Sequence, residues 1–205
     1  MVILYTVKNY IVKIYCNCTE GIIMEYTLVR SKRKSIALQV TNEGLIVKVP
    51  LKATKKDIEE VLDKHKSWID THLNNFNEQK KKAEGMTPIT NEDIKRLADE
   101  ALKVIPERVR YYAPKLGVTY GNITIRNQRT RWGSCSSKGN LNFNCLLMLA
   151  PREVLDSVVV HELCHLKEMN HSKRFYSEVL KVFPNYYECD KWLKENGKIL
   201  MMRME

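Results

Sequence analysis

The sequence predicts an α+β protein in which a small N-terminal β domain is followed by helices and by a second domain built around a cluster of histidines. Three observations support this prediction. Short runs rich in β-branched and aromatic residues fill the first 50 positions and favour strands. Apolar residues then recur at helical spacing. Three of the five histidines fall close together near the end of the chain. We therefore expect the divisions 1–52, 53–89 and 90–205.

The N-terminal β domain should contain several strands joined by short turns. Asn42, Glu43 and Gly44 form one predicted turn, and Pro50 ends the last run. The basic stretch Arg-Ser-Lys-Arg-Lys at residues 30–34 is expected in a hairpin between two strands. The predicted strands are residues 5–14, 22–29, 35–40 and 45–49.

Two helices should occupy the middle of the chain. Thr54 can cap the first, with Asp57 three residues later as a weak capping box. His65 lies on the apolar stripe of this helix, so we expect it to pack in the core. Residues 79–89 interrupt the pattern with lysines, a glycine and a proline and are predicted to form a linker or loop. The second helix opens near Thr90.

The remaining elements alternate between extended and helical patterns. The second helix should end near Tyr112, after which the chain becomes extended. Residues 141–147 alternate in the manner of a strand with one buried face. Pro151 suits the first turn of a helix. Ser172 can cap the next helix, and a last helix should end by Gly197.

The strongest functional signal is the sequence His-Glu-Leu-Cys-His at residues 161–165. On a helix, His161 and His165 lie one turn apart on the same face, so both imidazoles can bind one metal ion. Glu162 lies beside the first ligand, where it can act on a water bound to the metal. His171 supplies a third nitrogen, which leaves the open position of a catalytic zinc site.

Two alternatives to this site follow from the same residues. The motif could be a chance match on an exposed helix, although the preceding apolar residues would bury this helix. Glu178 or Glu188 could replace His171 in a site with two histidines and one glutamate. Asn170 is a plausible left-handed turn residue before His171. The apolar residues that argue against chance are Val154, Leu155, Val158 and Val159.

Composition indicates which partners and which cellular location to expect. The formal net charge of +10 favours acidic partners such as nucleic acid, nucleotides or acidic peptides. No apolar run approaches the roughly 20 residues of a membrane span, so no membrane partner is expected. The first residues make a poor signal peptide. Together with six scattered cysteines, this predicts reduced thiols and a cytoplasmic location.

Several further segments accompany the histidine motif. They are residues 129–136 (Arg-Thr-Arg-Trp-Gly-Ser-Cys-Ser), the strand around Asn142, residues 170–175 (Asn-His-Ser-Lys-Arg-Phe), Trp192-Leu193, residues 30–34 and Trp68-Ile69. Together they resemble the YgjP-like metallopeptidase family over about residues 24–200.

This resemblance implies a zincin-like α+β fold with a small N-terminal β domain. It also implies zinc held by His161, His165 and His171. The segment between the N-terminal helix and the second half is shorter than in the family pattern. Met24 resembles the usual start of the family, so this member is expected either to carry an extra strand or to begin translation there.

The residues before the predicted cleft strand are candidate substrate ligands. Arg129 and Arg131 could hold a carboxylate or a phosphate by paired hydrogen bonds. Alternatively, they pair with acidic groups and fix the tight turn at Gly133 and Ser134. Trp132 is expected in the core rather than as a substrate platform, because large aromatic residues are mostly buried.

These features predict a zinc-dependent hydrolase, with a metallopeptidase as the first function class. Glu162 would take a proton from the attacking water and pass it to the leaving group. Peptide or protein is the expected substrate. The same site could serve a metal-dependent nucleotide phosphohydrolase. A third class is a DNA-associated zincin in which basic residues bind phosphates.

Overall fold

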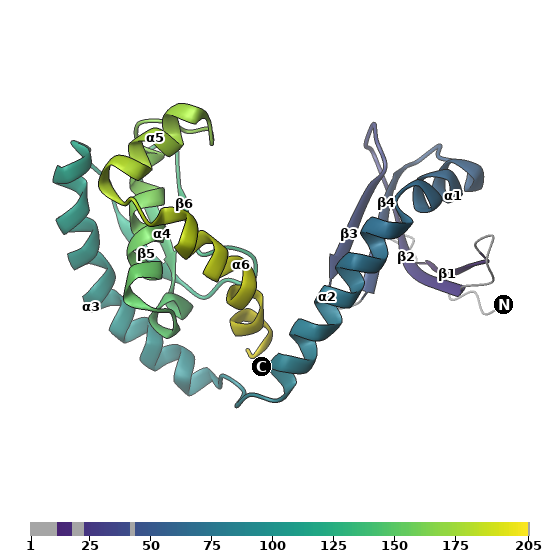
Figure 1. Cartoon of the computed structure of the whole chain (residues 1–205), viewed down its shortest axis with the longest axis horizontal. Coiled ribbons are helices and arrows are strands. Elements are labelled where there is room, and N and C mark those ends of the chain that lie inside the picture. The colour runs from purple at the N-terminus through teal and green to yellow at the C-terminus, as the bar shows by residue number, and fades with distance from the viewer. Residues whose placement is uncertain (1–11, 18–22, 42–43, 205) are drawn as a thin grey trace. The chain divides into compact units, whose positions relative to one another are not determined.

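The computed structural model describes residues 12–17, 23–41 and 44–204. The chain divides into two compact units, one extending to Gln79 and the other beginning at Lys80 (Figure 1). The first unit combines a sheet with helices, and the second is a mixed helical and sheet unit, so the α+β class is confirmed. Among the described residues, no helix combines the length and apolar character needed to cross a membrane.

The first unit is built on a four-stranded sheet. Its strands are β1 (Val12–Asn17), β2 (Ile23–Ser31), β3 (Ala37–Thr41) and β4 (Gly44–Pro50). Their order is β1-β2-β4-β3, with β2 and β4 parallel and the outer pairs antiparallel. Alternate residues of β4 are buried against α1 (Lys55–Lys64) and α2 (Lys66–Glu84). This core comprises Tyr26, Leu28, Leu45, Val47, Val49, Ile58, Leu62 and Ile69.

The basic stretch does not form the predicted hairpin. Because β4 lies between β2 and β3, the segment after Ser31 connects two strands that are not neighbours. Arg30 has a structural role, since its guanidinium donates hydrogen bonds to the carbonyls of Leu51 (3.1 Å) and Ala53 (2.8 Å). The start of the predicted strand 5–14 and the turn residues 42–43 lie outside the described residues.

The first helix begins as predicted but its histidine does not pack in the core. Thr54 accepts a hydrogen bond from the backbone of Asp57, whose carboxylate accepts one from Thr54 in return. His65 ends α1 instead of continuing the helical stripe, and its side chain is exposed. A break in the helix therefore changes which residues share a face.

The second unit begins with α3 (Asn91–Leu116), again opened by a capping box, between Thr90 and Asp93. This helix runs past the predicted end at Tyr112, through Pro106 and Pro114. It stops at Gly117, which has a left-handed backbone with φ of 65°. Glycine adopts that conformation without the steric cost of a side chain.

A three-stranded sheet follows, with β7 (Leu141–Asn144) between β5 (Ile123–Arg126) and β6 (Gly133–Cys135). The predicted strand 141–147 is too long, because the chain turns into the short helix η1 (Cys145–Leu149). Asn144 causes this change, since its side-chain oxygen accepts a hydrogen bond from the Leu146 amide.

Helix α4 (Arg152–Cys164) is the centre of the second unit. It contacts α3, β6, α5 (Lys173–Val182) and α6 (Tyr186–Met202), and 10 of its 13 residues are buried. The guanidinium of Arg108 on α3 binds both oxygens of the buried Asp156 on α4, at 2.6 Å each. This charge-assisted, two-point contact fixes α4 against α3.

The last helix does not end at Gly197 as predicted. Helix α6 continues to Met202, and Gly197 is buried inside it. A Cβ at this position would stand 2.9 Å from the indole nitrogen of Trp132. Glycine thus serves here for close packing rather than for ending a helix. The indole lies against α6, partly buried at the edge of the core, in agreement with the packing role expected of Trp132.

Candidate active site

The three predicted metal ligands are brought together by the end of α4 and the chain that follows it. His161 lies in the last turn of α4, and His165 caps its C-terminus. The chain then turns back, so that His171 approaches the same point just before Ser172 opens α5. The Ser172 hydroxyl accepts a hydrogen bond from the Phe175 amide (3.3 Å).

The turn is made without the left-handed residue expected at Asn170. No described residue other than glycine has a positive φ. Instead, the carbonyl of Asn170 accepts a tight hydrogen bond from the Ser172 amide at 2.7 Å. The reversal is therefore achieved with ordinary backbone angles.

Two distances between the imidazoles approach those of a tetrahedral metal site. The Nε2 atom of His161 lies 3.2 Å from Nε2 of His165 and 3.0 Å from Nε2 of His171. Two nitrogens in a tetrahedral site with Zn–N bonds of about 2.0–2.1 Å stand about 3.3–3.4 Å apart. Among the described residues, only these three histidines form a cluster able to hold a metal ion.

Surrounding groups favour the neutral, metal-binding form of these side chains. Burial, with the neighbouring imidazoles, lowers the pKa of His161 to about 4, and burial also lowers the pKa of His165. The ring of Phe175, fully buried, lies 4.6–4.9 Å from the centres of all three imidazoles. It forms an apolar floor that holds the rings in place.

The outward-facing nitrogens have their own partners. Nδ1 of His161 lies 2.8 Å from the hydroxyl of Tyr186, at the start of α6. Nδ1 of His165 lies 3.2 Å from the backbone carbonyl of Glu168. With Nε2 on a metal, each Nδ1–H can donate to these oxygens, which selects the tautomer and orients the ring. Sequence reasoning missed Tyr186, since nothing in the local pattern connects it with a histidine 25 residues earlier.

Glu162 has the surroundings of a reactive group. Its side chain is 5% exposed, and its Oε2 is buried with no hydrogen-bond partner among the described residues. Burial raises the pKa of Glu162 to about 8, although nearby Arg131 opposes the shift. Gly133 makes this position possible, because a Cβ there would lie 2.6–2.9 Å from the carboxylate atoms. A cation at the histidines would favour the ionised carboxylate.

The substrate residues predicted from sequence lie on the loop before β6. Arg131 is exposed and close enough to Glu162 to affect its pKa, and Arg129 is exposed on the same loop. Asn144 holds this loop in place through hydrogen bonds to its backbone. Its fully buried amide donates to the carbonyls of Gln128 (2.7 Å) and Arg131 (3.1 Å).

The two glutamates considered as replacements for His171 lie apart from the cluster. Glu178 on α5 forms ion pairs with Lys167 and Lys181, which lower its pKa to about 2. Glu188 is exposed on α6. Neither belongs to the group of possible metal ligands.

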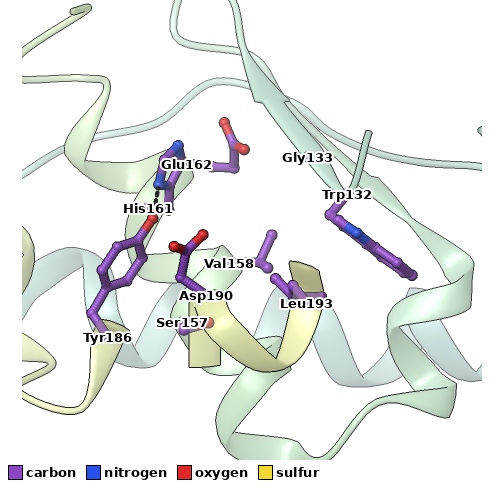
Figure 2. A pocket seen from close by; sticks show the side chains of 9 residues that line it. All are labelled: Trp132, Gly133, Ser157, Val158, His161, Glu162, Tyr186, Asp190 and Leu193. Atoms are coloured by element: carbon purple, nitrogen blue, oxygen red, sulfur yellow. Dashed lines mark hydrogen bonds between the residues drawn. The ribbon is translucent and has the colours of Figure 1, made fainter. Parts of the chain in front are cut away.

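A cavity of about 190 Å³ lies beside Glu162 and His161 (Figure 2). Its walls come from α4, from the segment around β6 and from α6. Figure 2 shows Tyr186 reaching His161 on one side, with the indole of Trp132 on the other. The lining residues are Trp132, Gly133, Ser157, Val158, His161, Glu162, Tyr186, Asp190 and Leu193.

The sequence profile described as YgjP-like, metallopeptidase domain, matches residues 34–96 and 89–196. The chain belongs to this family. The resemblance noted in the sequence is thus confirmed, and the metallopeptidase description of the family points to a metal-dependent hydrolase.

Individual relatives cover smaller parts of this YgjP-like chain. A UTP pyrophosphatase of Escherichia coli (strain K12) is 34% identical over 62 residues, which are 30% of this chain and 37% of that protein. The crystal structures of two metallopeptidase zymogens are also similar. Pyrococcus abyssi abylysin is 24% identical, with a TM-score of 0.43. The match covers 46% of this chain and 97% of abylysin. Methanocaldococcus jannaschii jannalysin is 28% identical, with a TM-score of 0.40. The match covers 47% of this chain and 98% of jannalysin.

Proposed function

We propose that this protein is a zinc-dependent peptidase that cleaves peptide or protein substrates. The observation that carries the proposal is the convergence of three imidazole nitrogens beside the buried Glu162, whose Oε2 has no hydrogen-bond partner in the described part of the chain. Three protein ligands leave a fourth position open, which is the arrangement of catalytic rather than structural zinc. The metallopeptidase description of the family supports the peptide bond as the target.

The residues of the site have separate roles in this reaction. Zinc, when bound by the three histidines, lowers the pKa of a water to about 7 and polarises the bond under attack. Glu162 accepts a proton from the attacking water and passes it to the leaving amine. Tyr186 holds His161 in one orientation. Arg131, on the exposed loop, can bind a carboxylate of the substrate or the charge that develops during attack.

A cytoplasmic location belongs to the same proposal. The described cysteines, Cys135, Cys145, Cys164 and Cys189, are all free, and three are buried. Free thiols persist in reducing compartments.

Nucleotide hydrolysis is a second candidate, favoured by three observations. The relative named UTP pyrophosphatase is similar over part of its length. A guanidinium near the general base, as Arg131 provides, could hold a phosphate as readily as a carboxylate. The net charge of +10 also suits an anionic substrate.

One experiment separates the two candidates. Zinc-loaded protein is assayed against casein, a peptide mixture and a panel of nucleoside triphosphates, with Glu162→Gln in parallel. We expect peptide cleavage that falls by roughly 10²–10⁴ in the variant while zinc and the melting temperature are kept, because only the base is removed. Turnover of a nucleotide alone would establish the second candidate. A variant with near-normal turnover and bound zinc would show that Glu162 is not the base.

A further inference from the structure

The cavity beside the candidate active site has apolar walls. Trp132, Val158 and Leu193 provide its large side-chain surfaces, from three different parts of the chain (Figure 2). Val158 lies one helical turn before His161 on α4, so the apolar wall is continuous with the metal site. The cavity therefore borders the place where the scissile bond would lie.

Three polar groups in the wall, those of Ser157, Tyr186 and Asp190, already have partners, whereas Oε2 of Glu162 has none among the described residues. The Ser157 hydroxyl donates to a backbone carbonyl one turn earlier (2.7 Å). The hydroxyl of Tyr186 pairs with His161, and the carboxylate of Asp190 pairs with Lys194 at 2.5 Å. A ligand group that carried N–H or C=O into this space would lose hydrogen bonds to water and find few in return. The walls thus favour a hydrocarbon.

The size of the cavity restricts the ligand further. At about 190 Å³ it is smaller than the roughly 300–1,000 Å³ of pockets that enclose drug-sized molecules. It has room for one side chain but not for a nucleoside triphosphate. A nucleobase alone would also bring several donors and acceptors to walls in which Ser157, Tyr186 and Asp190 are already engaged.

We propose that this cavity is a specificity pocket for one large apolar side chain, of the size of leucine or phenylalanine, on the residue adjacent to the cleaved bond. This inference rests on the proposed peptidase function and names its substrate class. The side chain would pack against the lining residues Trp132, Val158 and Leu193, while the peptide backbone would lie over Glu162 and the histidines.

The first test measures cleavage of matched peptides that differ only in having leucine or alanine at this position. We expect the leucine peptide to be preferred in kcat/KM by at least about 10-fold. Leu193→Trp fills the cavity and should abolish the preference with zinc content unchanged, whereas Leu193→Ala should shift it toward phenylalanine. Leu180→Trp is the matched control, because this partly buried leucine of α5 does not line the cavity.

The second test does not depend on turnover. Hydroxamic acids that carry hydrogen, isobutyl or benzyl beside the chelating group are titrated into zinc-loaded Glu162→Gln protein by calorimetry. We expect isobutyl and benzyl to bind at least about 10-fold more tightly than hydrogen, and Leu193→Trp to remove the difference. Equal affinities, or a difference that survives Leu193→Trp, would overturn the pocket. Selective binding by a protein that cleaves no peptide would overturn the proposed function and leave the pocket standing.

Discussion

At the scale of single residues, the site depends on small side chains as much as on reactive ones. Glu162 can be buried beside the metal ligands only because Gly133 has no Cβ. The indole of Trp132, the preceding residue, can pack against α6 only because Gly197 also has no Cβ. The Trp-Gly pair at the start of β6 therefore positions the candidate base and one wall of the cavity together.

The histidines should control metal content directly. We expect about one zinc per chain in the wild type, and loss of zinc in His161→Ala, His165→Ala or His171→Ala, because each removes one of three converging nitrogens. Elemental analysis and competition with a chelator measure this. Glu188→Ala is the control and should retain zinc. Full zinc content in a histidine variant, or zinc loss in the control, would show that other residues bind the metal.

Gly133→Ala should separate catalysis from metal binding. The added methyl group would lie 2.6–2.9 Å from the carboxylate of Glu162 and must displace it. We expect zinc to remain while hydrolysis falls by roughly 10²-fold or more, as for loss of a general base. Gly85→Ala is the matched control, since its nearest neighbours would be 3.7 Å away. Equal activity of the two variants would show that Glu162 tolerates the displacement.

At the scale of elements, the connection from α4 to α5 carries the metal site. His165 is the C-cap of α4, and His171 directly precedes Ser172, the N-cap of α5. The two helix caps therefore also position two of the metal ligands. The ion pair between Lys167 and Glu178 ties the connection to α5. The positions of two ligands thus depend on backbone that lies outside any helix.

Loss of the α5 cap should weaken both the fold and the metal site. Ser172→Ala removes the acceptor for the Phe175 amide and should cost about 1 kcal/mol of unfolding free energy. Because His171 is the preceding residue, we also expect a measurable fall in zinc affinity. Thr54→Ala removes the cap of α1 in the other unit at similar cost and should leave zinc affinity unchanged. Chemical denaturation and chelator competition on both variants make the comparison. Identical zinc affinities would mean that the cap does not hold His171.

At the scale of the whole molecule, the residues that the structure describes form two cores that share none of their buried residues. All three histidines and Glu162 belong to the second unit, as do the residues that line the cavity. The first unit has its own sheet and helices. Metal binding should accordingly be coupled to the stability of only one unit.

Zinc removal should loosen the second unit selectively. A ligand present at 100 times its dissociation constant stabilises the state that binds it by about 2.7 kcal/mol. After treatment with a chelator, we expect amide hydrogen exchange to accelerate in α4 and α5, while β2 and β4 keep their protection. Mass spectrometry of the exchanging protein resolves the two units. Equal acceleration in both would indicate that the chain unfolds as a single cooperative unit.

The sequence by itself determined the features that depend on neighbouring residues. The caps at Thr54 and Ser172 and the spacing of His161 and His165 follow from local helix geometry. The α+β class followed from short-range patterns in the same way. Element ends were less predictable: the side chain of Asn144 ends β7 by a hydrogen bond to the Leu146 amide, and α6 continues through Gly197, against which Trp132 packs.

Only the tertiary structure decided the contacts that join distant parts of the chain. It placed β4 beside β2, Tyr186 against His161, and Gly133 against Glu162. The alternation of the β7 strand suggested an outward polar residue at position 144, yet Asn144 is fully buried and holds the loop of Arg131. Such contacts depend on how whole elements pack, and packing places residues together according to shape and hydrogen-bonding capacity rather than distance along the sequence.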